Sequence, residues 1–310
     1  MKNTASFNSS YLVAALLILV GSIGFSAKAV MVKLAYRYGI DSISLLALRM
    51  LFSLPFFLVI AYWSNRRMTQ TYVLNKRDGA YILLFGLMGY YLASLFDFIG
   101  LQYITASLER LVLFIYPTLV VILSAIFLKQ KIYTRQYLAL LLTYIGIGMA
   151  FFDKGNVNEE SQIWLGAFWV FMSALSYAIH LIGSGNLLPR VGTLRYTSLV
   201  MMIACIAVLL HNAVVNQLQL FDFAPQVYVL GIMMAVFSTV LPSFLFMQGI
   251  KIIGSSNASI IGSIGPISTV ALAYLFLDER LGWLQWGGTF LVIVGVLMIS
   301  LQRRKAHKIV

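Results

Sequence analysis

Six ionisable side chains lie inside long apolar stretches of this sequence, and they offer the most chemistry. An ionisable group in apolar surroundings is costly, so each one is a candidate functional residue. The cationic groups can hold an anionic solute, while the carboxyl groups can hold a cation or carry a proton. The six candidates are Lys28, Arg49, Asp97, Glu109, Arg110 and His180.

These residues also have a purely structural interpretation. A buried ion-pair network, such as Asp97 with Arg49 or Arg110, orders a bundle, and breaking one member costs roughly 3–5 kcal/mol. Glu109 and Arg110 are adjacent, so on a helix they point about 100° apart and at most one faces a given partner squarely. A lone histidine such as His180 is more often a packing residue than a ligand.

Prolines and glycines mark where helices should break. Pro117 predicts a kink, and Gly262, Gly265 and Pro266 fall within about one and a half turns of each other. A break frees backbone carbonyls, which a membrane tolerates only against protein or a water-lined cavity. These residues are therefore predicted to form part of a cavity wall, with close packing of small residues as the alternative.

The elements that position these residues are transmembrane helices. The 310-residue chain is 61% hydrophobic and 10% charged, with a mean hydropathy of +0.90, against about 25% charge in soluble domains. We predict an all-α polytopic membrane protein with ten transmembrane helices, because ten apolar runs are long enough to span a bilayer. The runs are 12–35, 43–63, 79–101, 105–128, 136–152, 163–188, 196–215, 227–249, 255–277 and 282–300.

The first run also resembles a cleavable signal peptide, because Ala27-Lys28-Ala29 imitates a signal-peptidase site. Cleavage there would leave nine spans. We favour retention, since an internal repeat in the chain requires this segment.

Charge placement predicts the orientation. With the N-terminus in the cytoplasm, most of the 22 lysines and arginines fall in cytoplasmic gaps, and nearly all acidic residues outside the spans fall on the other side. This bias predicts cytoplasmic N- and C-termini in the cell (inner) membrane. Lys33 is expected to snorkel to the outer interface. The basic residues sit in short gaps rather than on one basic face, so nucleic acid is not an expected partner.

The two halves of the chain match weakly at a shift of 149 residues. Gly100 aligns with Gly249, Pro117 with Pro266, and at a shift of 152 Lys28 aligns with His180. Five spans per half is an odd number, so the second copy must be inverted relative to the first. The predicted units are 10–152 and 163–301, and inverted repeats of this kind are typical of transporters.

The segments from Gly100 to Pro117 and from Gly249 to Pro266, followed by Leu277-Asp-Glu-Arg280, resemble EamA-type transporters of the drug/metabolite transporter superfamily. The resemblance implies two inverted five-helix repeats around a central cavity, and export or exchange of small metabolites. The chain departs from the family pattern at Glu109-Arg110, and at Lys129-Gln130-Lys131 in place of an acidic pair.

The sequence therefore predicts a secondary transporter, expected to be an exporter, of small amino-acid-like or organic-anion solutes. A passive channel and a receptor or scaffold remain alternatives. Zinc-protease and serine-hydrolase motifs are absent, so no enzyme is expected. The single Cys205 provides no metal-site spacing, and neither a metal nor a cofactor is predicted. A coupling proton is a candidate partner, and the oligomeric state stays open, with a homodimer among the alternatives.

Overall fold

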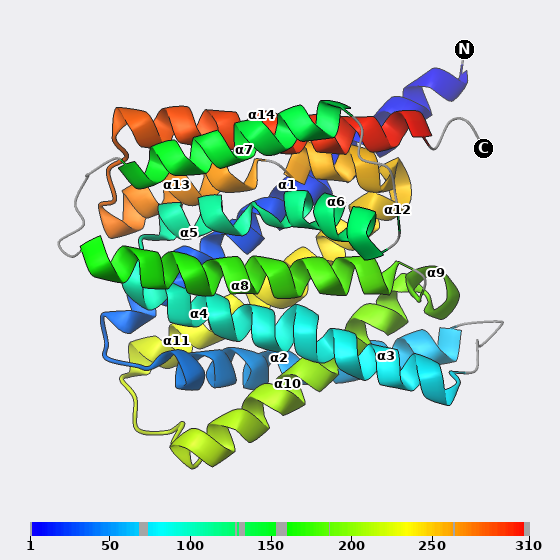
Figure 1. The fold of residues 1–310 in the computed structure, drawn as a ribbon. Helices are drawn as coiled ribbons and strands as arrows, with labels where there is room; N and C mark the ends of the chain where they lie inside the picture. The colour runs from blue at the N-terminus through cyan, green and yellow to red at the C-terminus, as the bar shows by residue number, and fades with distance from the viewer. Residues whose placement is uncertain are drawn as a thin grey trace.

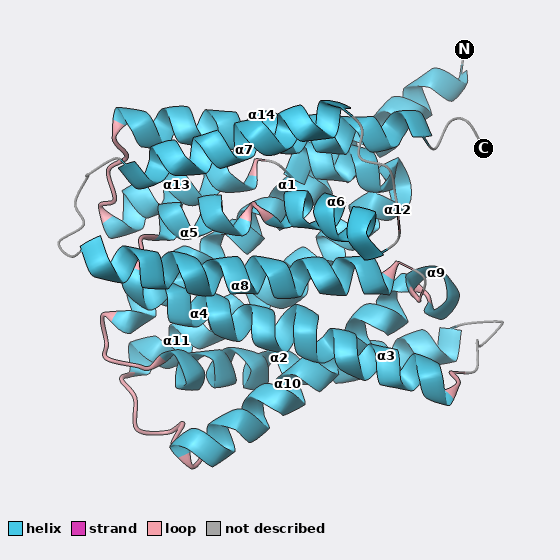
Figure 2. Ribbon diagram, in the orientation of Figure 1, coloured by secondary structure: helices cyan, strands magenta, loops and turns pink. Residues whose placement is uncertain are grey.

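A computed structural model describes residues 2–67, 74–127, 129, 134–152, 160–185, 187–262 and 264–306. These residues form helices joined by short loops, without a strand (Figures 1 and 2). Helices are suited to a membrane, because each one satisfies its backbone hydrogen bonds within its own segment. The sequence also has an acidic stretch at 153–162, between the fifth and sixth predicted runs, and its residues 153–159 lie outside the described residues.

The helices fall into two runs of similar order. The first run contains α1 (Lys2–Tyr36), α2 (Ser42–Arg67), α3 (Lys76–Gly86), the π-helical segment η1 (Leu87–Leu92), α4 (Ala93–Tyr103), α5 (Ala106–Leu113), α6 (Tyr116–Phe127) and α7 (Thr134–Phe152). The second contains α8 (Glu160–Ser184), the single turn α9 (Leu188–Val191), α10 (Thr193–Asn216), α11 (Pro225–Ala235), the π-helical segment η2 (Val236–Val240), α12 (Leu241–Gly262), α13 (Gly265–Leu277) and α14 (Trp283–Ala306).

Seven helical segments of the described chain are long and apolar enough to cross a membrane. Three further apolar helices are shorter, over Gln136–Ala150, Gly265–Leu277 and Trp283–Gly295. Many large apolar side chains face outward, including Val214 at 83% and Trp283 at 94% exposure. Apolar surface on this scale needs lipid rather than water, so the chain is an integral multi-pass membrane protein.

Helices from the two runs pack against each other across the bundle. α1 packs on α12 and α13, while α8 packs on α4 and α6. α2 pairs with α10, and α7 pairs with α14. In Figure 1, α1 and α8 cross the bundle in opposite directions, as do the paired helices α2 with α10 and α7 with α14. Each run therefore contributes half of every main interface.

Helix breaks fall close to the predicted positions, with one difference. α5 ends at Leu113 and α6 begins at Tyr116, which places Pro117 in the first turn of α6. Pro266 occupies the corresponding place at the start of α13, and residue 263 between α12 and α13 lies outside the described residues. The gap expected at 250–254, between the eighth and ninth runs, instead lies inside α12.

Small residues allow α7 and α14 to approach closely. A Cβ atom added to Gly146 would lie 2.5 Å from the carbonyl oxygen of Gly288 and 3.0 Å from Cβ of Leu291. A Cβ atom added to Gly148, half a turn along α7, would meet nothing within 4 Å. Close approach of helix backbones at small residues is a main source of packing in membranes.

We expect Gly146→Ala to destabilise the protein and Gly148→Ala to leave it unchanged or slightly more stable. Both changes favour the helix by about 1 kcal/mol, but overpacking at residue 146 costs about 1–3 kcal/mol. The measurement is the thermal unfolding midpoint of each variant in detergent. Equal midpoints for the two variants would contradict the close α7–α14 contact.

Candidate functional site

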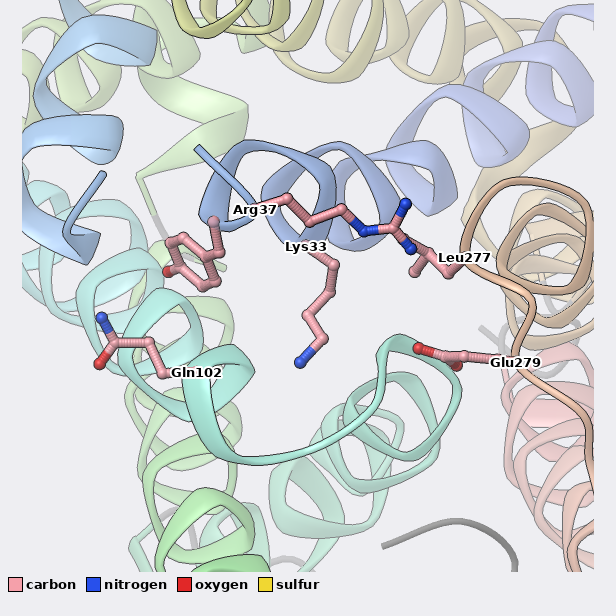
Figure 3. Close-up of a pocket in the computed structure, with 6 residues that line it drawn as sticks. Lys33, Arg37, Gln102, Leu277 and Glu279 are labelled. Atoms are coloured by element: carbon pink, nitrogen blue, oxygen red, sulfur yellow. The ribbon is translucent and has the colours of Figure 1, made fainter. Parts of the chain in front are cut away.

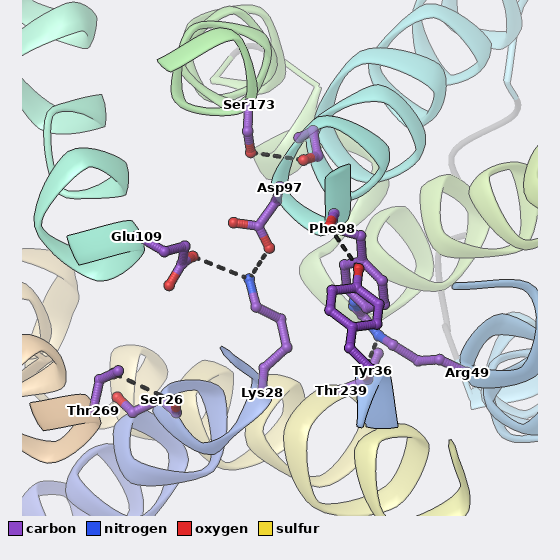
Figure 4. Close-up of polar contacts among 11 residues, drawn as sticks. Ser26, Lys28, Tyr36, Arg49, Asp97, Phe98, Glu109, Ser173, Thr239 and Thr269 are labelled. Carbon is purple, nitrogen blue, oxygen red and sulfur yellow. Dashed lines mark hydrogen bonds and ion pairs between the residues drawn. The ribbon is translucent and has the colours of Figure 1, made fainter. Parts of the chain in front are cut away.

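Three helices of the first run meet at an ion-pair cluster, defined here as Lys28 of α1, Asp97 of α4 and Glu109 of α5. Lys28 Nζ lies 2.5 Å from Asp97 Oδ2 and 3.7 Å from Glu109 Oε1 (Figure 4). Asp97 and Glu109 are 1% and 0% exposed, and the Lys28 side chain is 15% exposed. The interior therefore holds two carboxyl groups around one amine.

This cluster is left with unused hydrogen-bonding capacity. Among the described residues, neither carboxyl oxygen of Glu109 has a hydrogen-bond partner, and Oδ1 of Asp97 has none either. A buried carboxylate without partners is unfavourable. A proton, or a donor group of a bound solute, would satisfy Glu109, so the arrangement can hold either.

Arg110 lies beside the cluster, but its hydrogen-bond and ring contacts are with other groups. Its Nη2 lies 3.4 Å from Ser26 Oγ, and its guanidinium carbon lies 5.1 Å from the centre of the Phe114 ring. Arg110 forms no ion pair within the described part of the chain, and its buried Nε lacks a hydrogen-bond partner. It is a cation in the interior with unused donors.

The same guanidinium lies between the two helix breaks. Phe114 follows the last residue of α5, and Gly265 is the first residue of α13. A Cβ atom added to Gly265 would lie 2.8 Å from Nη2 of Arg110, and Ser26 Oγ donates a hydrogen bond to the Gly265 carbonyl at 3.0 Å. Arg110 and Ser26 therefore connect α1, α5 and α13 where the helices are interrupted.

Arg49 is not part of the ion-pair cluster. Its Nε donates to Thr239 Oγ1 at 2.9 Å, and its guanidinium carbon lies 5.4 Å from the centre of the Phe98 ring (Figure 4). The suggested ion pairs of Asp97 with Arg49 or Arg110 do not form, because Lys28 occupies that place. Thr239 belongs to η2, so Arg49 supports an irregular helical segment instead.

His180 lies among aromatic rings, apart from the charges. Its Nδ1 lies 2.9 Å from the carbonyl oxygen of Phe85, and its ring centre lies 5.1 Å from that of Tyr90. The side chain fills the space beside Gly89, where any added Cβ would clash with the imidazole. Gly89 and Tyr90 belong to η1, so His180 contacts the π-helical segment of the first run.

Glu279 is a site residue that sequence reasoning missed. Its carboxylate accepts hydrogen bonds from Ala106 N at 2.9 Å, Ser107 N at 3.1 Å and Ser107 Oγ at 2.7 Å. It thereby caps the N-terminus of α5, the helix that carries Glu109 and Arg110. Thr105 and Ser107 mark a helix start in the sequence, but no sequence pattern indicates that a distant carboxylate completes the cap.

A cavity of about 350 Å³ lies beside Lys33 at the end of α1 (Figure 3). Its lining comes from the ends of α1 and α4 and from the end of α13 with the loop that follows. Lys33 Nζ donates to the Leu101 carbonyl at 3.0 Å, and its position at the outer interface stays a prediction. The lining residues are Lys33, Tyr36, Arg37, Gln102, Leu277 and Glu279.

A helical membrane bundle with charged groups and interrupted helices in its interior fits a membrane transporter. The EamA-like transporter family model matches residues 12–152 and 164–301. The chain belongs to the EamA-like transporter family.

Several known proteins are similar over most of their length. The uncharacterized transporter YcbK of Bacillus subtilis (strain 168) is 31% identical over 291 residues, covering 90% of this chain and 91% of that protein. The uncharacterized inner membrane transporter YicL of Salmonella typhimurium is 25% identical over 238 residues, covering 74% and 76%. A protein of known crystal structure aligns with a TM-score of 0.62 at 13% identity, covering 94% of this chain and 98% of that one, which supports the fold alone.

We expect Lys28→Met to destabilise the protein strongly. It leaves Asp97 and Glu109 facing each other without their cation, and such a loss costs about 3–5 kcal/mol. Adding Asp97→Asn should restore part of the stability. The measurement is the thermal unfolding midpoint in detergent, with Lys76→Met at an exposed position as the control. If the Lys28 and Lys76 variants unfold at the same temperature, the ion pair has no structural weight.

Proposed function

We propose that this protein is a secondary transporter that exports small organic metabolites by alternating access. The observation that carries the proposal is Arg110, which has no ion-pair partner among the described residues. It lies beside the partly satisfied cluster of Lys28, Asp97 and Glu109, between the end of α5 and the start of α13. Interior charges mark solute and ion pathways in membrane proteins, and discontinuous helices commonly form transporter binding sites.

Ten crossings in two inverted repeats fit this mechanism. Seven long apolar segments and three shorter ones correspond one to one with the ten predicted runs. The shift of 149 residues relates the start of η1 at 87 to that of η2 at 236, and the starts of α6 and α7 at 116 and 134 to those of α13 and α14 at 265 and 283. The opposite directions of α1 and α8 in Figure 1 support inversion.

We place the N-terminus and C-terminus in the cytoplasm and the protein in the cell membrane. The first turn of α1 and the last turn of α14 lie at the same end of the bundle (Figure 1). Lys76 and Arg77 open α3 at that end, while Asp41, Asp222 and Glu279 lie in the connections at the opposite end. The positive-inside rule then assigns the basic end to the cytoplasm, and the inner-membrane name of YicL agrees with this location.

Residue chemistry favours solutes that carry a carboxylate, including amino acids. Arg110 offers unused donors in a planar fork that suits a carboxylate. The oxygens of Glu109 can accept a hydrogen bond from a solute ammonium group. We assign Arg49 and His180 a positioning role instead, through η2 and η1 respectively.

Glu109 is our candidate for the coupling proton. The charged groups that face it are Lys28 from α1, Asp97 from α4 and Arg110 on its own helix. The Lys28 amine is already paired with Asp97 at 2.5 Å, so its interaction with Glu109 is the weaker of the two. A carboxyl group in this position can gain and lose a proton as solute and water enter and leave the site.

Metabolite profiling tests the export proposal. Cells that overproduce the wild type should accumulate one class of carboxylate-bearing metabolite outside, and cells that lack the protein should not. Glu109→Gln at equal membrane levels should abolish the difference, while Asp222→Asn in an exposed loop should preserve it. Unchanged profiles in every strain would refute export.

A second experiment isolates the proton. In proteoliposomes loaded with the metabolite that profiling identifies, an imposed pH gradient should drive accumulation by the wild type. Glu109→Gln should lose this gradient-driven transport but keep solute exchange at equal pH, because the amide binds no proton. Equal gradient dependence in both proteins would remove Glu109 from the coupling mechanism.

A further inference from the structure

We propose that the cavity beside Lys33 is a second binding site, specific for the carboxylate group of a small organic acid or amino acid. Its volume of about 350 Å³ lies within the range of roughly 300–1,000 Å³ that is typical of small-molecule sites. In Figure 3 the Lys33 side chain extends between α1 and the segment that joins α4 to α5, with Arg37 and Glu279 on one side and Gln102 on the other.

Two cations of this cavity have donors to spare. Lys33 Nζ donates to the Leu101 carbonyl, which uses one of the three donors of an ammonium group. Arg37 is exposed in the turn that directly follows α1. Neither residue forms an ion pair within the described ranges, so both remain available to an anion.

The one acidic residue in the lining is already engaged. Both carboxylate oxygens of Glu279 accept hydrogen bonds from the start of α5, and three such bonds are formed in total. The positive end of a helix dipole compensates an anion in this position. The charge of Glu279 still acts on Lys33, but its oxygens are held by α5, so two cations and one carboxylate leave the lining with a net positive charge.

The remaining lining adds shape and one adaptable polar group. The Tyr36 hydroxyl is engaged, since it donates to the Phe98 carbonyl at 2.6 Å. Leu277 contributes apolar surface, and Gln102 offers an exposed amide that can donate or accept. A solute with a carboxylate and a second small polar group matches this lining better than a cation or a long apolar molecule.

The cavity lies further along α1 and α4 than the ion-pair cluster, since Lys28 contacts Asp97 and Lys33 contacts Leu101, one turn later on α4. Lys33 follows Lys28 by five residues on α1, which is about 7.5 Å along the helix axis. A carboxylate that leaves Arg110 toward this end of the bundle would next meet Lys33 and Arg37. This place on a transport path rests on the proposed function, whereas the charge selectivity of the cavity does not.

Thiol labelling of the purified full-length protein tests the charge selectivity. Cys205 is buried and is replaced by Ala, and Gln102→Cys supplies a reporter in the lining. The probes are two methanethiosulfonates of similar size, one with a sulfonate and one with a trimethylammonium group. The measured quantity is the ratio of their labelling rates, compared with the same reporter in a Lys33→Gln/Arg37→Gln background.

We expect the sulfonate-to-ammonium ratio to fall about tenfold or more when both cations are removed, since local charge changes association rates by about 10–10³-fold. Succinate should slow labelling by the sulfonate reagent, and choline at equal ionic strength should not. A Leu277→Cys reporter repeats the measurement from the other half of the chain if Gln102→Cys disturbs folding.

An unchanged ratio, a reporter that neither reagent reaches, or equal protection by succinate and choline would overturn the proposal. If the labelling is charge-selective but cells that overproduce the protein export nothing, the cavity is an anion site and the export proposal is rejected. If the cells export metabolites but the labelling is not charge-selective, the export proposal stands and the anion site is rejected. The two proposals therefore fail independently.

Discussion

The ion pair between Lys28 and Asp97 is the contact on which the interior arrangement depends. Two opposite charges in a medium of low polarity attract strongly, but each also loses its hydration, so the pair is favourable only at close range. The 2.5 Å separation fixes α1 against α4, and the 3.7 Å approach of Glu109 brings α5 to the same point. Because one amine serves two carboxyl groups, the arrangement is stable enough to form yet remains incomplete. That incompleteness gives the site something to exchange with a solute or a proton.

Backbone hydrogen bonding imposes the second constraint, and four of the described departures from regular helix lie beside polar side chains. The breaks before α6 and α13 lie beside Arg110 and Ser26, and Ser26 takes up the Gly265 carbonyl. The π-helical segments η1 and η2 meet His180 and Arg49 respectively. The irregular segments and the buried polar side chains therefore depend on each other, since polar groups left without partners are unfavourable in lipid. A wholly regular bundle would offer a solute no free backbone groups.

Hydropathy and charge were enough to predict a helical membrane protein and to select Lys28, Asp97 and Glu109, because an ionisable residue in an apolar run is conspicuous. The pairing was not predictable, since it depends on how each helix is rotated about its axis; the sequence suggested Arg49 or Arg110 for Asp97, where the fold supplies Lys28. Glu279 lay beyond sequence reasoning for a related reason. Its role is defined by the start of a helix more than 170 residues away, and local patterns carry no information on such contacts.

The two runs of helices share their breaks but not their charges. At the shift of 149 residues, Asp97 corresponds to Phe246, Glu109 to Ala258 and Arg110 to Ser259. Backbone geometry is thus repeated, while the ionisable chemistry is concentrated in the first run. In the alternating-access mechanism proposed above, equivalent movements of the two runs open either end of the bundle, and a single set of charges serves both. The Glu279 cap on α5 joins the second run to the helix that carries those charges, so a separation of the runs at that end must break its three hydrogen bonds. In the proposed mechanism, the cap would couple the exposure of the site to the rearrangement of the two halves.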